Sequence, residues 1–275
     1  MPEPYRAVLI SAGLKHPRVR EFLAAKRHPV SQCLAYPVAL ESCWMVGQAM
    51  LAGVTLRAVF VCPALLEEAE GLALAEKAVG LGAEGYEVSE KVLARLTGRD
   101  RPDGAAALGL ALQRTLGDIR VGRRTRVVIA DGWDLPGNLG TLIRCSDAAG
   151  ASGVLVVGQT FGLSHPLVLK ASLAAALTVP VVAVGRQAAI RWLRDEGFRI
   201  VAADPAGRRS YRNIDYRGPL AIVVGSERRG LAPEWLAAAD SIAAIPMLGI
   251  CDSLNAALAG ALLLYEALAQ GGDES

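Results

Sequence analysis

The stretch Ile245-Pro246-Met247-Leu248-Gly249-Ile250-Cys251-Asp252-Ser253-Leu254-Asn255, with the apolar run after it, decides how the chain is organised. Asp252 is a good N-cap residue, so the pattern predicts a loop up to Asp252 and a helix over 253–270. Apolar residues recur at helical spacing on one face of this helix, at Leu254, Ala257, Leu258, Ala261, Leu262, Tyr265 and Leu268. The opposite face is also small or apolar, which predicts a helix buried on all sides.

Length and composition indicate a two-domain globular protein. The chain has 275 residues, of which 52% are hydrophobic and 20% charged, enough to bury a sizeable core. We see neither a secretory signal nor an apolar run long enough to span a membrane, so we expect a cytoplasmic protein. The five cysteines, Cys33 among them, form no C-x-x-C pair, which argues against a zinc site or a disulfide framework, and we expect no metal.

Positive charge is concentrated in the first half of the chain. Residues 1–126 hold 17 Lys and Arg against 13 Asp and Glu, whereas the rest holds 12 against 14. The basic residues cluster in 15–27 and 91–126, the footprint either of a phosphate-backbone partner or of an ordinary solvated surface. Our candidate RNA-binding residues are Lys15, Arg18, Arg20, Arg99 and Arg101.

The pattern of elements predicts a small α/β domain over 1–117, a basic linker over 118–125 and a second α/β domain over 126–275. In the first domain we expect a helix over 38–53 that ends at a glycine. In the second, short apolar runs alternate with helical patterns, which predicts a mostly parallel sheet covered on both faces. Ligands bind such sheets beyond the carboxyl ends of the strands.

Two further loops, both rich in glycine and polar residues, follow predicted strands of the second domain. In the first, over 131–144, Asn138 is a plausible N-cap, and apolar neighbours predict that Arg144 is buried and paired. In the second, over 224–231, Gly225 permits a close backbone approach to a ligand, and Glu227 could bond the first loop or pair with Arg144. Neither loop has a dinucleotide or P-loop fingerprint, which argues against a dehydrogenase.

The three loops together resemble the three signature motifs of the SpoU (TrmH) family of RNA ribose 2′-O-methyltransferases, in the SPOUT class. The matching patterns are Asn138-x-Gly140-x-x-x-Arg144, then Val224-Gly225-Ser226-Glu227-x-x-Gly230-Leu231, then Ile245-Pro246-Met247 with Asp252-Ser253-Leu254-Asn255. The resemblance implies a trefoil knot in the second domain, a homodimer, and S-adenosylmethionine held by the three loops. The small first domain would bind RNA.

The resemblance also implies roles for individual residues. The cofactor would be held by Gly225, Ile245, Met247, Gly249 and Leu254. The catalytic site would be shaped by Asn138, Arg144, Glu227, Ser253 and Asn255. Because the pKa of arginine lies above about 12, we expect Arg144 to act as a fixed cation and phosphate clamp rather than as a base. Trp44, Trp133, Trp192 and Trp235 are expected to pack, with Trp133 the one candidate for stacking on a base.

The function favoured by the sequence is methyl transfer to a ribose 2′-hydroxyl of RNA, with 23S rRNA preferred as the target. An rRNA enzyme of the antibiotic-resistance type is one possibility within that prediction. The alternatives are a tRNA 2′-O-methyltransferase, a SPOUT enzyme that methylates a base, and a non-catalytic RNA-binding protein with the same fold.

Overall fold

The structure, a computed structural model, describes residues 9–27, 35–66 and 68–271. The chain divides into two compact units, residues 1–113 with 164–169 and residues 114–163 with 170–275. Cys33 lies outside the described residues. Among the described residues, no helix is long and apolar enough to cross a membrane.

The first unit is built on a five-stranded mixed sheet with the order β1-β4-β3-β5-β2. Strand β5 runs antiparallel to both of its neighbours, β2 and β3, while β1, β4 and β3 pair in parallel. Its elements are β1 (Ile10–Ser11), α2 (Pro17–Arg27), β2 (Ala35–Leu40), α3 (Cys43–Leu51), β3 (Thr55–Val61), α4 (Glu68–Gly80), β4 (Glu84–Glu87), α5 (Glu90–Thr97) and β5 (Ala105–Leu112).

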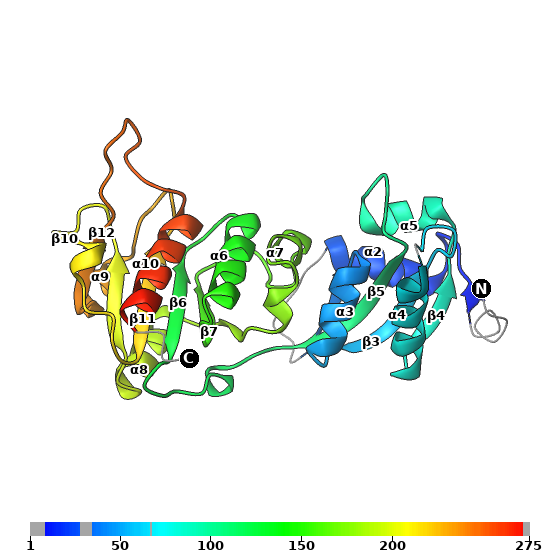
Figure 1. Cartoon of the computed structure of the whole chain (residues 1–275), viewed down its shortest axis with the longest axis horizontal. Coiled ribbons are helices and arrows are strands. Elements are labelled where there is room, and N and C mark those ends of the chain that lie inside the picture. Colours follow the sequence, from blue (N-terminus) through cyan, green and yellow to red (C-terminus); the bar gives the residue numbers. More distant parts are fainter. Residues whose placement is uncertain (1–8, 28–34, 67, 272–275) are drawn as a thin grey trace. The chain divides into compact units, whose positions relative to one another are not determined.

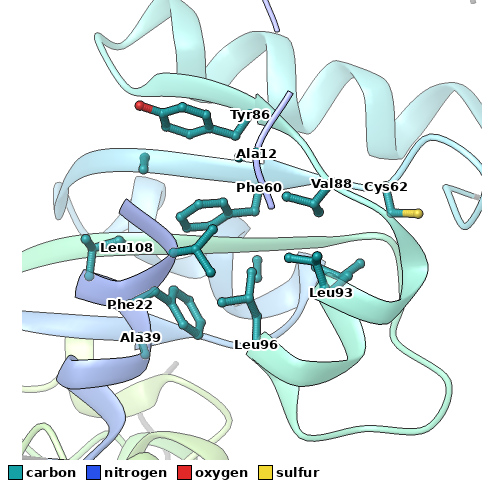
Figure 2. Close-up of a cluster of buried hydrophobic side chains, with 14 of the residues drawn as sticks. Ala12, Phe22, Ala39, Phe60, Cys62, Tyr86, Val88, Leu93, Leu96 and Leu108 are labelled. Atoms are coloured by element: carbon teal, nitrogen blue, oxygen red, sulfur yellow. The ribbon is translucent and has the colours of Figure 1, made fainter. Parts of the chain in front are cut away.

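The core on one face of this sheet is aromatic (Figure 2). Phe60 of β3 lies at its centre, with the Tyr86 ring stacked 5.7 Å away and the Phe22 ring edge-on at 5.7 Å. Leu93 and Leu96 of α5 are fully buried in the same cluster. Helices α2 and α5 are therefore held to the sheet by one continuous apolar cluster.

The helix expected over 38–53 is wrong, because a strand and a shorter helix share that stretch. Residues 35–40 form β2, an edge strand paired with β5, and α3 begins only after Ser42. The Ser42 hydroxyl accepts a hydrogen bond from the backbone N–H of Met45, 3.2 Å away, and so caps α3. The apolar residues on both sides of Ser42 conceal this break in the sequence pattern.

The second unit contains a seven-stranded sheet with the order β10-β12-β9-β11-β6-β7-β8, in which every strand pair is parallel (Figure 1). The mostly parallel sheet expected from the sequence is thus confirmed. Its elements are the 3₁₀ turn η1 (Leu116–Asp118), β6 (Arg126–Asp131), α6 (Pro136–Ala148), β7 (Gly153–Val157), η2 (Ala175–Leu177), β8 (Val181–Ala183), α8 (Arg186–Asp195), β9 (Arg199–Ala203), β10 (Arg209–Ser210), η3 (Tyr211–Asn213), β11 (Leu220–Gly225), α9 (Pro233–Ala238), β12 (Ser241–Ala244) and α10 (Ala256–Gln270). Helix α7 (Pro166–Ala171) is divided between the two units after Leu169.

The last helix differs from its prediction in both its start and its burial. Helix α10 begins at Ala256 and is capped by Asn255, whose side-chain oxygen accepts from the backbone N–H groups of Ala257 and Leu258. Asp252 is not its cap. The helix is also not buried all round, because Leu258, Leu262 and Tyr265 are 51%, 40% and 47% exposed.

The buried side of α10 packs against the sheet and α6, and Gly260 marks the closest approach. A Cβ atom built on Gly260 would lie 2.7 Å from the Leu142 side chain of α6 and 3.3 Å from that of Val224 of β11. Small residues on this side of α10 thus let the helix sit close to the sheet, next to the loops that follow β6 and β11.

Candidate functional site

The three loops singled out from the sequence leave the same edge of the second sheet. Strands β6 and β11 are parallel neighbours that end in register, with Gly225 opposite Asp131. Strand β12 lies on the other side of β9 and runs in the same direction. The loops after β6, β11 and β12 therefore meet beyond the carboxyl ends of the strands, where ligands bind in open parallel sheets.

One carboxylate joins all three loops. Oxygen Oε1 of Glu227, in the second loop, accepts from the side-chain amide of Asn138 at 3.0 Å and from that of Asn255 at 2.8 Å. The same oxygen accepts from the backbone N–H of Ala256 at 3.2 Å. The Asn255 amide also donates to the Asn138 side-chain oxygen at 3.2 Å, which closes the triangle. Hydrogen bonds to an ionised acceptor are stronger than neutral ones, so Glu227 is the acceptor on which this contact depends.

The pairing of Glu227 with the first loop is thus one of the two alternatives open from the sequence, and the structure shows it. Arg144, the other candidate partner, is exposed on α6 and is not buried as expected. Asn138 is not the N-cap of α6 either, because the helix begins at Pro136 and its cap is Leu135. Asn138 instead uses its side chain to reach the second loop.

A second set of contacts fixes the first loop to the end of β11 and to the second loop. The indole N–H of Trp133 donates to the Val224 carbonyl at 3.0 Å, and the side chain is 2% exposed, so Trp133 is a packing residue and not a stacking platform. In the second loop, the Arg229 guanidinium donates to the Gly132 carbonyl at 3.2 Å and to the Asp134 carboxylate at 3.1 Å. The first and second loops are held together at two further points.

Gly225 is required for a different reason from the one expected. The second loop turns back on itself, with Ser226 and Gly230 joined by backbone hydrogen bonds of 3.2 and 2.9 Å. A Cβ atom on Gly225 would collide with the backbone of Gly230 and Leu231. Gly225 therefore permits a close approach between two parts of the second loop rather than between the loop and a ligand. The backbone of Gly230 and Leu231 cannot move aside as a flexible side chain could.

Two pockets lie on either side of Glu227 and share Ser226, Glu227 and Ala256 as walls. The first has a volume of about 150 Å³ and is largely apolar. Of the residues expected to hold a cofactor it contains Gly225, Ile245, Met247 and Leu254, together with Ser253 of the catalytic set. The second has a volume of about 250 Å³ and is lined by Asn138, Arg228 and residues 133–135 besides the shared walls.

Three residues predicted for the site line neither pocket, namely Arg144, Gly249 and Asn255. Gly249 belongs to the loop between β12 and α10, which extends beyond the sheet in Figure 1. Leu248 and Ile250 on either side of it are 97% and 105% exposed.

The basic residues predicted to bind RNA differ in their exposure and in whether they already pair with carboxylates. The Arg18 guanidinium donates to Glu84 at 2.9 Å and to Glu21 at 2.8 Å, and this contact holds the pKa of Glu84 down to about 2. A phosphate would have to displace these carboxylates. Lys15, Arg20 and Arg101 are exposed and Arg99 is half-buried. Their contact with RNA stays a prediction.

Sequence reasoning missed Arg229 and the backbone N–H of Ala256 as parts of the site. The Glu-Arg-Arg run gave no sign of which arginine would turn back to the first loop, because the choice depends on the turn between Ser226 and Gly230. Among the described residues, no group of three or more His, Cys, Asp or Glu is placed to hold a metal ion.

Comparison with known proteins places this site in a family. The model of the SpoU rRNA Methylase family matches residues 125–265. A solved RNA 2′-O ribose methyltransferase is 32% identical, with a TM-score of 0.79 over 94% of this chain and 98% of that one. An AdoMet-bound rRNA methyltransferase from Sinorhizobium meliloti is 30% identical, with a TM-score of 0.82 over 94% of this chain and 96% of the other.

A curated relative from Staphylococcus saprophyticus, described as a putative TrmH family tRNA/rRNA methyltransferase, is 38% identical over 141 residues. That match covers 51% of this chain and 57% of the relative. The fold is that of a SPOUT-class α/β protein. The chain belongs to the SpoU rRNA Methylase family.

The geometry at Gly225 predicts a large and local cost of adding one methyl group. Gly225→Ala should lower the free energy of unfolding of the second unit by about 2 kcal/mol or more, because the return of the loop must move. Gly249→Ala is the matched control, since a Cβ atom there meets nothing within 4 Å. Urea denaturation followed by circular dichroism measures both, and equal stability of the two variants would contradict the packing described for Gly225.

Proposed function

We propose that this protein transfers a methyl group from S-adenosylmethionine to a ribose 2′-hydroxyl of RNA, with 23S rRNA as the favoured target. The observation that carries the proposal is the Glu227 contact with Asn138 and Asn255. This contact lies between two pockets that share lining residues. A methyl donor and its acceptor need adjoining binding sites of this kind in order to react.

The chemistry of the first pocket fits the cofactor. Val224, Leu231, Ile245, Met247 and Leu254 give it an apolar lining suited to a heteroaromatic base, and the loop backbones offer polar groups at its edges. When bound, S-adenosylmethionine supplies a methyl group on a positively charged sulfur. The pocket volume of about 150 Å³ is below the roughly 300 Å³ of typical small-molecule sites, so the exposed loop 246–253 has to shift as the cofactor enters.

The second pocket would receive the acceptor nucleotide. Asn138 and Glu227 line it, so the ribose would meet the same side chains that hold the three loops together. Their main task is to position the hydroxyl, because alignment alone can lower the barrier substantially. Arg144 keeps its predicted role as a fixed cation for the developing charge and an RNA phosphate, with its exposed position leaving the guanidinium free to meet RNA.

Support for rRNA comes from the description of the family and from the S. meliloti neighbour, which is an rRNA methyltransferase. The tRNA alternative is kept because the staphylococcal relatives are described as tRNA/rRNA enzymes. An antibiotic-resistance role stays a prediction. Either RNA target would place the protein in the cytoplasm.

A homodimer is also part of the proposal, as is the trefoil knot implied by the family. The exposed stripe on α10, formed by Leu258, Leu262 and Tyr265, supports a second copy as its cover. Its spacing of four and three residues puts the three side chains on one face of the helix. Contiguous exposed apolar side chains of this kind mark interaction sites.

The proposed activity predicts methyl transfer from radiolabelled S-adenosylmethionine to bare 23S rRNA or intact 50S subunits in preference to bulk tRNA. Nuclease digestion should place the label on ribose. Asn138→Ala should reduce transfer at least about tenfold, because it removes one of the donors to Glu227. Label on a base would replace the ribose assignment, and failure of the protein to bind the cofactor would remove the enzymatic proposal.

The dimer predicts that Leu258→Glu combined with Leu262→Glu lowers the molar mass measured by light scattering to that of one chain. A carboxylate in an apolar contact loses its hydration without a partner, which opposes association. Leu81→Glu, at an exposed position of the first unit, is the control and should leave the mass unchanged. A monomeric wild-type protein would contradict this part of the proposal.

A further inference from the structure

A large cavity lies wholly within the first unit. It has a volume of about 1180 Å³ and is formed by α3, α4, α5 and the loop over 98–103. Its walls combine an aromatic ring, aliphatic side chains and cations: Trp44, Leu51, Leu74, Lys77, Lys91 and Arg101. We call it the α3–α5 groove.

Trp44 is much more exposed in this groove than the sequence predicts. The expectation that it packs in the interior is wrong, because its side chain is 59% exposed, whereas Trp133 and Trp235 are 2% and 0% exposed. Leu51, also on α3, is 73% exposed and lines the same groove. A large aromatic side chain exposed to water beside other apolar groups is typical of a binding surface.

Three basic side chains of the groove could bind an anion. In the part of the chain that the structure describes, Lys77, Lys91 and Arg101 take part in none of the ion pairs found. All three line the groove together with its apolar side chains. Such a combination suits a ligand that has a flat apolar part and a negatively charged part.

Three acidic residues, Glu90, Asp100 and Asp103, line the groove as well. The Asp103 carboxylate accepts from the backbone N–H of Cys43 at 3.1 Å, at the start of α3. Glu90 lies in the first turn of α5, where the helix dipole favours a negative charge. Burial and the nearby Asp103 raise the pKa of the Cys43 thiol to about 11, so this thiol adds no negative charge at neutral pH. Among the described residues of the lining, the acids therefore equal the cations in number.

We propose that the α3–α5 groove binds an unpaired segment of RNA, with a base stacked on Trp44 and the adjoining phosphates held by Lys77, Lys91 and Arg101. Every nucleobase has a face that can stack on an aromatic ring, and the phosphates then lie within reach of the cations. Duplex RNA keeps its bases stacked on one another and offers no free face. This inference rests on the proposed function and adds to it a second RNA contact.

The test uses the full-length chain and a fluorescein-labelled decamer of uridylate, which is unpaired, with a duplex of the same length as comparison. Fluorescence anisotropy should show tighter binding to the single strand. Trp44→Ala should weaken that binding about tenfold or more, and Trp44→Phe should retain most of it, because stacking needs a ring rather than this particular ring. Leu81→Ala, at an exposed apolar position outside the groove, should change nothing.

The charged side chains of the groove give an independent readout. Neutralising Lys91 and Arg101 together, as Lys91→Gln and Arg101→Gln, should lower the slope of log affinity against log salt by roughly 0.7 for each phosphate that is no longer neutralised. Arg114→Gln, whose side chain pairs with Asp118 outside the groove, is the control. The tryptophan fluorescence of the wild-type chain should be quenched by the oligonucleotide, and this quenching should disappear in Trp44→Phe.

Several results would overturn the inference. They are absence of binding to the decamer, equal affinity of Trp44→Ala and wild type, and an effect of Trp44→Ala on binding to intact 50S subunits alone, which would indicate a protein partner in the groove. Failure of the proposed function looks different: the cofactor would not bind or no RNA would be methylated. Titration of S-adenosylmethionine into Trp44→Ala keeps the two apart, because cofactor affinity should equal that of the wild type.

Discussion

The hydrogen bonds to one carboxylate oxygen of Glu227 are the constraint on which the site depends. Asn138 follows β6, Glu227 follows β11, and Asn255 and Ala256 follow β12, so the bonds join segments that are distant in sequence and leave three different strands. Loops of this kind have no stable structure alone, and a shared acceptor gives them a common position. Because Asn255 also caps α10, the same contact ties the last helix to the strand ends.

The rest of the second unit supplies the conditions for this contact. The parallel sheet places the ends of β6 and β11 side by side, and Gly260 lets α10 approach the strands closely enough for Asn255 to reach Glu227. Gly225 lets the second loop fold back so that Glu227 reaches Asn138 and Asn255 and Arg229 reaches the first loop. The two pockets follow from this arrangement, since Glu227 is one of the residues that line both of them.

Much of this could be predicted from the sequence, for reasons that differ between residues. Short apolar runs such as 127–130 and 220–224 predict buried parallel strands, and the polar residues after them predict a site at the strand ends. The sequence could not show that residues 35–40 form an edge strand, because pairing with β5 is a long-range contact. Nor could it place the start of α10, because both Asp252 and Asn255 are good caps. The contact of Asn255 with Glu227, which is distant in sequence, favours Asn255. Trp44 was misjudged because exposure depends on what the neighbouring helices leave uncovered.

Hydrogen exchange measured by mass spectrometry on the Glu227→Ala variant tests the account most directly. If Glu227 holds the three loops together, peptides covering 132–140 and 253–260 should exchange faster than in wild type, although the substitution lies in neither. Peptides of the first unit, such as 55–61, should be unaffected and serve as the internal control. A change confined to residues around 226–230 would show that the loops are positioned independently and would contradict the central role given to Glu227.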